Sequence, residues 1–281
     1  MQFVVVYKSA QSAIAMKKIF LIAASSLCAL ASFAWSQKGH DTVAYIAECH
    51  LTPAAADSVA AILEGKSPVY WANWLDNASH TPDYAYTKTW HYKNINEGVD
   101  YDDAPLNPDG DAVRAIREQI AILADSISTR SQKQLAMKIL IHVVGDLHQP
   151  MHLGRETDKG ANYVKVRFFG RDANLHSVWD GSIMNSGHAW TYTEWQNQLD
   201  RLPDDKAKAE AAGNVDDWGR QTYEIAKAVY DYFPAGSKIS YDQVAYWTPV
   251  IEQQVLRGGL RLARILNALY DPESTNKPAD F

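Results

Sequence analysis

Apolar side chains recur at three- and four-residue spacing along most of the chain, which predicts a mainly α-helical protein. The clearest stretch runs from Gln132 to Leu147 and is strongly apolar, so we expect it to be a central helix of the core. Further helices are expected over residues 43–50, 111–123 and 251–269. Thr52-Pro53 adds a capping residue followed by proline at a first helical position, which marks another helix start.

Apolar and polar residues alternate clearly only between Tyr163 and Phe168, where Val164, Val166 and Phe168 are separated by basic residues. That period of two predicts a short β-hairpin in an otherwise helical protein. No internal repeat, low-complexity tract or linker interrupts the rest of the chain. We therefore expect residues 35–281 to form one mainly α domain with a short β-hairpin.

The first 34 residues have the pattern of a targeting segment. Met16-Lys-Lys is followed by an uncharged stretch from Ile19 to Ala34, which ends in the small-residue pattern Ser32-Phe33-Ala34. This is typical of a signal peptide, and the stretch is shorter than the roughly 20 residues that a spanning helix needs. We expect residues 1–34 to be an upstream extension plus signal peptide, without a membrane anchor. The mature protein would begin at Trp35 and be secreted or periplasmic.

Composition narrows the possible partners. The 281 residues carry 27 Lys plus Arg and 33 Asp plus Glu, a formal net charge of −6. This balance argues against a protein that holds nucleic acid through a basic surface. Only two cysteines are present, and loss of Cys28 with the leader would leave Cys49 without a partner for a disulfide.

Histidine and aspartate recur in short motifs that suit a metal site. His142 and Asp146 stand four apart in the apolar helix and share one face, and His176 and Asp180 repeat that spacing. A single such pair could be a hydrogen bond within a core, but burying charge without a partner is costly, and here the pairs are not alone. The full candidate set is His40, Asp76, His91, His142, Asp146, His152, His176 and Asp180.

Five histidines and three aspartates exceed the four or so ligands that one zinc ion takes. They suit two or three ions, one carboxylate acting as a bridge. Clustered dications would give an acidic protein the local positive field that phosphates seek, and they promote hydrolysis at phosphorus. The spacing therefore predicts a hydrolytic polynuclear zinc site.

The same motifs resemble those of the secreted zinc-dependent single-strand nucleases of fungi and plants, the S1/P1 nuclease family. The matching elements, in order and spacing, are Trp35 with Gly39-His40, Trp74-Leu-Asp76, His91, the segment from His142 to His152, and His176-Ser-Val-Trp-Asp180. The resemblance implies the mainly helical fold shared with zinc-dependent phospholipases C, and a cluster of three zinc ions. The absence of the fungal disulfide cysteines fits a bacterial exported member better.

Carried over by position, the resemblance assigns each ligand. Asp76, His91, His142 and Asp146 would hold the first zinc ion, and Asp146 would bridge to a second ion. His40 and the amine and carbonyl of Trp35 would complete that second site, so cleavage of the leader would be needed to free the amine. The third ion would be held by His152, His176 and Asp180.

The resemblance also implies an endonuclease that cleaves single-stranded DNA and RNA to 5′-phosphorylated products and acts as a 3′-nucleotidase. Asp76 would orient the attacking water and is the catalytic residue. Tyr92 falls where the family places an aromatic that stacks on a base, and stacking tolerates any sequence. Asn94 replaces a usual base-contacting aspartate, and Ser79 replaces a basic residue expected near the scissile phosphate. No obligate protein partner is evident.

Two other functions remain open at this point. A phospholipase C could use the same fold and cluster, but the last ligand motif ends in Asp180 where those lipases are expected to have Glu. A non-catalytic exported zinc-binding protein is the second alternative. The intact Asp76 argues against it, whereas Ser79 keeps it open.

Overall fold

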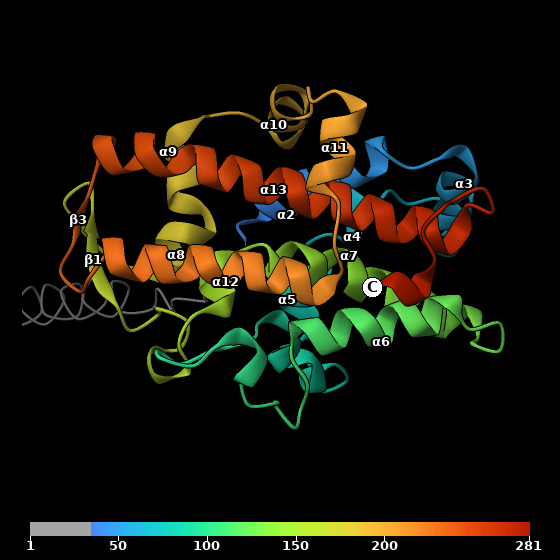
Figure 1. Cartoon of the computed structure of the whole chain (residues 1–281), viewed down its shortest axis with the longest axis horizontal. Helices are drawn as coiled ribbons and strands as arrows, with labels where there is room; N and C mark the ends of the chain where they lie inside the picture. Colours follow the sequence, from blue (N-terminus) through green and yellow to red (C-terminus); the bar gives the residue numbers. More distant parts are fainter. Residues whose placement is uncertain (1–34) are drawn as a thin grey trace, which may run out of the picture. The chain divides into compact units, whose positions relative to one another are not determined.

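The computed structural model describes residues 35–281, and the predicted leader, residues 1–34, lies outside the described residues. Helices dominate the described part of the chain (Figure 1), which confirms the prediction of a mainly α fold. The α-helices are α2 (Gln37–Cys49), α3 (Pro53–Ile62), α4 (Pro68–Trp71), α5 (Trp74–Ala78), α6 (Ala112–Ala124), α7 (Arg130–Leu147), α8 (Leu175–Ser177), α9 (Ile183–Gly187), α10 (Tyr192–Leu199), α11 (Asp204–Glu210), α12 (Val215–Tyr232) and α13 (Tyr241–Tyr270). Short 3₁₀ helices join several of them, among them η1 (Ala85–His91) and η3 (Pro150–Leu153).

Helix α7 occupies the centre of the packing, as its apolar sequence predicts. Thr129 caps its first turn in a capping box with Gln132, and this starts the helix two residues before the predicted boundary. From Ile139 to Leu147 every side chain is buried, because α7 packs against α2, α6 and α13. Polar residues in this segment are therefore held away from solvent.

Helix α13 begins ten residues before the position that periodicity predicts. Pro249 lies inside it, yet Val244, Trp247 and Ile251 continue one buried face through the proline. Burial of that face keeps the segment helical although proline removes a backbone donor. The helix packs most extensively against α2, which carries His40 (Figure 1).

The predicted hairpin is present and belongs to a small sheet. Strand β1 (Lys165–Phe168) pairs antiparallel with β2 (Arg171–Asn174), with Lys165 opposite Asn174. Strand β3 (Lys238–Ile239) adds to the other side of β1 in parallel, giving the order β2-β1-β3. A two-residue strand has too little alternation to be recognised from sequence. Strand β2 runs directly into α8, so the sheet fixes where His176 lies.

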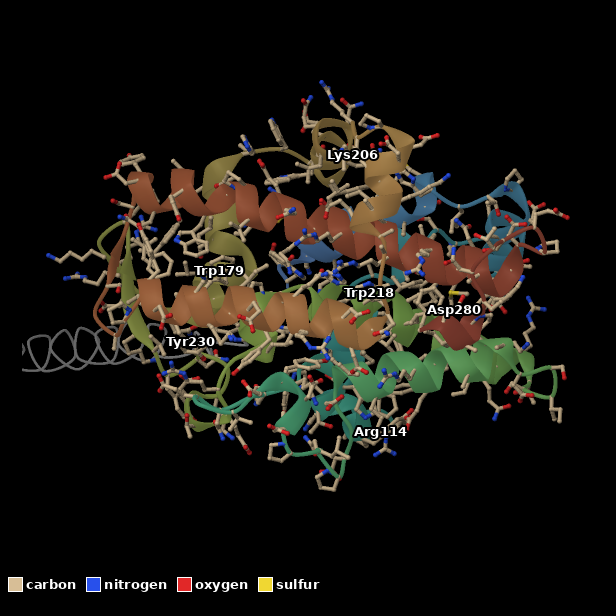
Figure 2. The ribbon with its side chains drawn as sticks, viewed as in Figure 1. Arg114, Trp179, Lys206, Trp218, Tyr230 and Asp280 are labelled. Carbon is tan, nitrogen blue, oxygen red and sulfur yellow. The ribbon has the colours of Figure 1, made fainter. Side chains whose placement is uncertain are left out.

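Two hydrophobic clusters make up the core. Trp218 belongs to the first, which surrounds α6 and α7, and Trp179 belongs to the second, around α9 and the amino-terminal half of α13 (Figure 2). Helix α2 contributes to both, with Ala44 in the first cluster and Val43 in the second. None of the helices within residues 35–281 combines the length and the hydrophobicity needed to cross a membrane.

Candidate metal centre

Asp146 lies at the centre of the site, fully buried near the end of α7. Its Oδ2 is 3.1 Å from His142 Nε2 and 3.0 Å from His91 Nδ1. Its Oδ1 is 3.4 Å from His40 Nε2 and 3.3 Å from His152 Nδ1. One carboxylate thus contacts four imidazoles from four separate elements, and its two oxygens face different pairs.

Two overlapping groups of ligand atoms form around α7. One consists of His40, His142 and Asp146, and the other of Asp76, His91 and His142, with the ligand atoms of each group within 4.8 Å of one another. The rings of His40 and His142 stack with centroids 4.0 Å apart. Asp76 Oδ1 lies 3.4 Å from His142 Nε2. The structure therefore brings together side chains that are up to about a hundred positions apart in sequence.

A third group joins His152, His176 and Asp180, again with ligand atoms within 4.8 Å. His176 Nε2 is 3.4 Å from Asp180 Oδ2, and His152 Nε2 is 3.9 Å from Asp180 Oδ1. Asp180 lies in a short π-helical turn, Val178–Ser182, which follows α8. π-Helical turns are rare in proteins overall, and those that occur are often found at functional sites. All eight His and Asp side chains that the motifs predict thus fall into three adjoining groups.

Backbone carbonyls fix the orientation of three imidazoles. The Nδ1 atoms of His142 and His152 each lie 2.7 Å from a carbonyl oxygen, that of Ala72 for His142 and that of His91 for His152. His176 Nδ1 contacts the carbonyl of Gly160 in the same way. A carbonyl only accepts, so each Nδ1 carries a proton and each Nε2 is left to face the group as the potential metal-binding atom. Neutral imidazole with this tautomer is the form that binds metal.

Several atoms of the groups lack any other partner. His40 Nδ1 and Nε2, His91 Nε2 and Asp146 Oδ1 are buried without a hydrogen bond among the described residues. Buried polar atoms in folded proteins are nearly always paired. Among these atoms, His40 Nε2 and Asp146 Oδ1 face each other at 3.4 Å. A nitrogen and a carboxylate oxygen that converge in this way fit a metal ion, because imidazole with carboxylate is a donor set that zinc accepts.

The charges of the site agree with that reading. Burial lowers the pKa of His152 to about 3 and that of His176 to about 4, so both imidazoles are neutral at pH 7. Burial also opposes charge on His142, but the carboxylates of Asp146 and Asp76 raise its pKa well above the ordinary value, so a bound metal ion would take the place of a proton on its Nε2. Against its own burial, Asp146 has its pKa lowered well below the ordinary value by His142 and His152. The carboxylates around α7 thus favour a bound positive charge.

Trp35 and the start of α2 lie beside the third group. The Ser36 amide donates to the carbonyl of Asp180 over 2.6 Å, and the side chain of Trp35 is fully buried against Gly39. A Cβ added to Gly39 would lie 2.9 Å from the Cβ of Trp35, so only glycine allows this packing. The contact explains why the motif pairs Trp35 with Gly39-His40.

The two predicted substrate residues flank the third group. The Lys93 amide donates to the carbonyl of His152 and the Ile95 amide to that of Gly154, both over 2.9 Å, so residues 93–95 run alongside residues 152–154. Tyr92 and Asn94, at either side of Lys93, are both half-buried. Ser79 is different, because it is buried and its hydroxyl donates to the carbonyl of Asp76 over 3.2 Å. This hydrogen bond closes the last turn of α5.

Sequence reasoning missed Gln149. This side chain is fully buried, its amide nitrogen donates to Asp180 Oδ1, and its amide oxygen accepts from the Met151 amide. It therefore links the segment after α7 to the π-helical turn that holds Asp180. No periodicity indicates such a contact, because its two ends are 31 residues apart.

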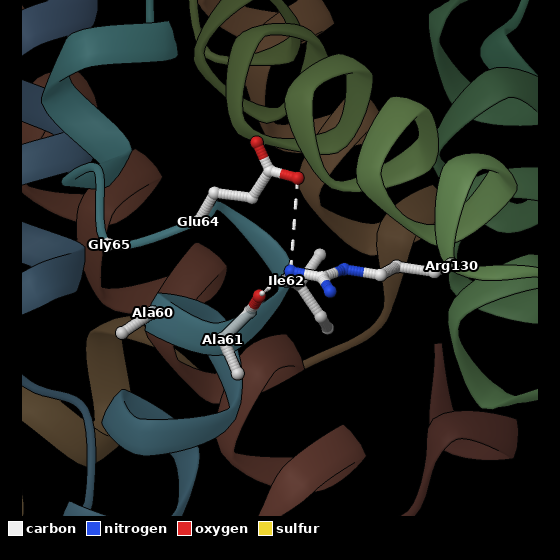
Figure 3. Close-up of a pocket in the computed structure, with 6 residues that line it drawn as sticks. All are labelled: Ala60, Ala61, Ile62, Glu64, Gly65 and Arg130. Atoms are coloured by element: carbon white, nitrogen blue, oxygen red, sulfur yellow. Dashed lines mark hydrogen bonds and ion pairs between the residues drawn. The ribbon is translucent and has the colours of Figure 1, made fainter.

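A separate pocket of about 480 Å³ lies between the end of α3 and the start of α7 (Figure 3). Its lining includes Ala61, Glu64 and Arg130, and Arg130 Nη2 lies 3.8 Å from Glu64 Oε1. None of the eight predicted metal-binding side chains lines it. This pocket is therefore separate from the three groups around Asp146.

Comparison with known proteins agrees with the motifs. The family model described as S1/P1 Nuclease matches residues 35–271. Nuclease S1 of Aspergillus oryzae is 31% identical over 178 residues, which are 60% of this chain and 61% of that protein. Nuclease P1 of Penicillium citrinum is 26% identical over 273 residues, 85% of this chain and 99% of that protein. Endonuclease 2 of Arabidopsis thaliana is 25% identical over 269 residues, 84% and 90% of the two chains.

Proposed function

The chain belongs to the S1/P1 nuclease family, and on that premise we propose that it is a zinc-dependent endonuclease. It hydrolyses phosphodiester bonds of single-stranded DNA and RNA to 5′-phosphorylated products and removes phosphate from 3′-nucleotides. The observation that carries this proposal is the position of Asp146, whose Oδ2 contacts His142 and His91 while its Oδ1 contacts His40.

Nine residues would hold three zinc ions. The first ion would be held by Asp76, His91, His142 and Asp146, the second by Asp146, His40 and the amine and carbonyl of Trp35, and the third by His152, His176 and Asp180. Contact of Asp146 with His142 through Oδ2 and with His40 through Oδ1 supports its role as the bridge. When bound, the ions supply positive charge for phosphate oxygens and lower the pKa of water.

Asp76 orients the water that attacks phosphorus. Burial opposes its charge, but His142 lowers the pKa of the Asp76 carboxyl below its ordinary value, so it is an ionised acceptor at neutral pH. Its backbone carbonyl is held by the Ser79 hydroxyl, which keeps the turn of α5 in place. An ionised, fixed carboxylate is suited to accept a hydrogen bond from water.

Tyr92 and Asn94 bind the nucleotide next to the cleaved bond. The half-buried ring of Tyr92 offers one face for a base, and pairing of residues 93–95 with residues 152–154 keeps it beside the third group. A duplex hides its base faces, and this accounts for a preference for single strands. Asn94 can donate as well as accept hydrogen bonds, which an aspartate cannot do.

We also propose that the protein is exported after removal of its leader. The leader pattern of residues 1–34 favours a secreted or periplasmic protein, and the missing fungal disulfide cysteines favour a bacterial one. Residues 35–281 would form its catalytic domain. Removal of the leader would create the Trp35 amine. An uncleaved chain is therefore expected to lack one ligand of the second ion.

The proposal is tested on protein verified to begin at Trp35. Hydrolysis of denatured DNA and of short-chain phosphatidylcholine is measured in parallel, after chelation and again after zinc is restored. Zinc-restorable cleavage of DNA alone supports the nuclease. Cleavage of lipid alone would favour a phospholipase C, and no activity with zinc bound would favour a non-catalytic zinc-binding protein.

A matched pair of variants links that activity to the site. Asp76→Asn should lower DNA hydrolysis by more than about 100-fold, because losing even an outer partner of a metal ligand costs 10- to 100-fold. Asp83→Asn, seven residues later on an exposed turn, should leave it unchanged. Equal activity in both variants would remove Asp76 from the mechanism.

A further inference from the structure

Four aromatic side chains form a continuous row beside the metal centre. Tyr70 packs edge-to-face on Trp71 with centroids 4.9 Å apart, Trp71 on Trp74 at 6.5 Å, and Trp74 on Tyr84 at 5.0 Å. We call these residues the aromatic row. Tyr70 is 62% exposed, and the other three are half-buried, so the row reaches the surface along its length.

Two lysines lie over the rings of this row. Lys138 Nζ is 3.5 Å from the centroid of the Trp71 ring and 5.4 Å from that of Trp74. Lys66 Nζ is 5.0 Å from the Tyr70 ring. Attraction between an ammonium group and the negative face of a ring holds each lysine over the row.

Lys138 carries a charge that the protein itself leaves without a close counter-ion. No carboxylate within residues 35–281 lies in ion-pair distance of its Nζ, and Glu64 acts on it only from farther away. Partial burial of this ammonium lowers its pKa. An anion brought to the row would meet an available cation held in a fixed place.

The row is built on the elements that carry one of the metal groups. Trp74 lies in α5 with Asp76, and Tyr84 directly precedes η1, which ends at His91. Lys138 lies one turn before His142 on the same face of α7. Trp71 precedes Ala72, whose carbonyl contacts His142 Nδ1. The row is therefore continuous in structure with Asp76, His91 and His142.

We propose that the aromatic row with Lys66 and Lys138 binds the single-stranded substrate beyond the bond that is cleaved. The inference rests on the proposed nuclease function and names a second contact region for the same strand. Lys138 and Lys66 would contact successive phosphates, and the exposed ring of Tyr70 and the half-buried ring of Tyr84 would stack on bases. Alternation of aromatic rings with cations is how proteins bind single strands without reading sequence.

Charge favours a nucleic acid strand as the occupant. The chain as a whole is acidic, so a polyanion is attracted only where cations stand without acidic partners. Lys138 meets that condition next to the metal groups, where the same polyanion would already be bound. A strand that spans both regions gains affinity from each.

The test measures binding by the zinc-loaded protein to a phosphorothioate oligonucleotide of about 12 nucleotides, which resists cleavage and exceeds one binding region. Dissociation constants are determined by fluorescence anisotropy over a range of salt concentrations. Lys138→Gln is expected to raise the dissociation constant about threefold to tenfold and to reduce the salt slope by about one phosphate contact. Tyr70→Ala should weaken binding by about fivefold or more through lost stacking.

Lys133→Gln is the matched control, since Lys133 lies on the same helix but contacts no ring of the row. It should leave both the dissociation constant and the salt slope as in the wild type. Equal losses in Lys133→Gln and Lys138→Gln would show only a general charge effect and overturn the inference. Unchanged binding in both Lys138→Gln and Tyr70→Ala would overturn it as well.

The experiments distinguish failure of the inference about the aromatic row from failure of the proposed nuclease function. If the wild-type protein cleaves denatured DNA while its variants bind the oligonucleotide normally, the inference about the aromatic row is wrong, whereas the proposed nuclease function is supported. If the wild type neither cleaves denatured DNA nor binds the oligonucleotide, the proposed nuclease function itself is wrong. Tyr70 is mostly exposed, so Tyr70→Ala is expected to fold, and its thermal midpoint checks this.

Discussion

Asp146 Oδ2 lies 3.1 Å from His142 Nε2, one helical turn apart on α7, and both side chains are completely buried. His40, His91 and His152 surround the same carboxylate. Ligand atoms packed this closely in a core are costly unless positive charge compensates the carboxylates. Metal ions would provide that charge, which connects the stability of the core to occupancy of the site.

Chelation is therefore expected to destabilise the fold as well as to stop hydrolysis. One ion at a free concentration 100 times its dissociation constant stabilises by about 2.7 kcal/mol, so removal should lower the thermal midpoint by roughly 5 to 10 °C or more. The measurement is a thermal melt with chelator, followed by restoration with zinc or, as control, with magnesium. A midpoint indifferent to zinc would contradict the account.

Asp146 and Asp180 should differ in how many ions they hold. Asp146→Asn alters the carboxylate that contacts His142 and His91 through one oxygen and His40 through the other, whereas Asp180→Asn alters a ligand of the third group alone. Zinc content by elemental analysis should fall by two ions in the first variant and by one in the second. Both should lose more than about 100-fold in activity. Equal zinc loss in the two variants would rule out a bridging role.

Gln149 should affect metal binding although it is not a ligand. Gln149→Ala removes the donor to Asp180 Oδ1, and losing such a partner typically costs 10- to 100-fold in metal affinity or activity. Competition with a chelator measures the affinity, and excess zinc should restore most of the activity. Normal zinc affinity in this variant would show that Gln149 only supports packing.

Tyr92→Ala should weaken substrate binding more than catalysis. Loss of one stacked base costs about 1 to 3 kcal/mol, which appears as a higher KM for oligonucleotides with a smaller change in kcat. Hydrolysis of a series of single-stranded oligonucleotides measures both constants. A fall in kcat with unchanged KM would place Tyr92 outside the base-binding role.

Ala161 offers a test of backbone strain next to His176. It is fully buried with φ +66°, a left-handed conformation that costs a residue with a Cβ about 1 to 2 kcal/mol. Ala161→Gly should therefore raise the free energy of unfolding by roughly 0.5 to 1 kcal/mol, after the greater flexibility of the unfolded chain is subtracted. Denaturant titration measures it, and a decrease in stability would show that the methyl group packs favourably.

Periodicity predicted most of the fold because burial here follows helix faces. The expected helices at 111–123 and at Gln132–Leu147 differ from α6 and α7 by one or two residues, and Thr52 with Pro53 does begin α3. Strand β3 could not be predicted, since a two-residue strand depends on β1 for its hydrogen bonds. The early start of α13 was also missed, because proline weakens a helix locally while tertiary burial sustains it.

The candidate metal centre was likewise predicted only in part from the sequence. Helix spacing paired His142 with Asp146 and His176 with Asp180, since residues four apart share one face. The division of the remaining ligands among three groups came from the resemblance to the nuclease family, and the structure places them accordingly. Contacts that depend on tertiary structure could not be read from the chain, among them the carbonyl of Ala72 on His142 and the amide of Gln149 on Asp180. His148, between two ligand motifs, turns away and contacts Arg261 instead.

The central claim is that three zinc ions held by the groups around Asp146 make this protein a single-strand nuclease. Its most direct test titrates metal-free protein that begins at Trp35 with zinc while hydrolysis of denatured DNA is followed. Activity is expected to appear with added zinc and to reach its plateau at three ions per chain, one for each group. Full activity without zinc, or a plateau at a single ion, would contradict the account.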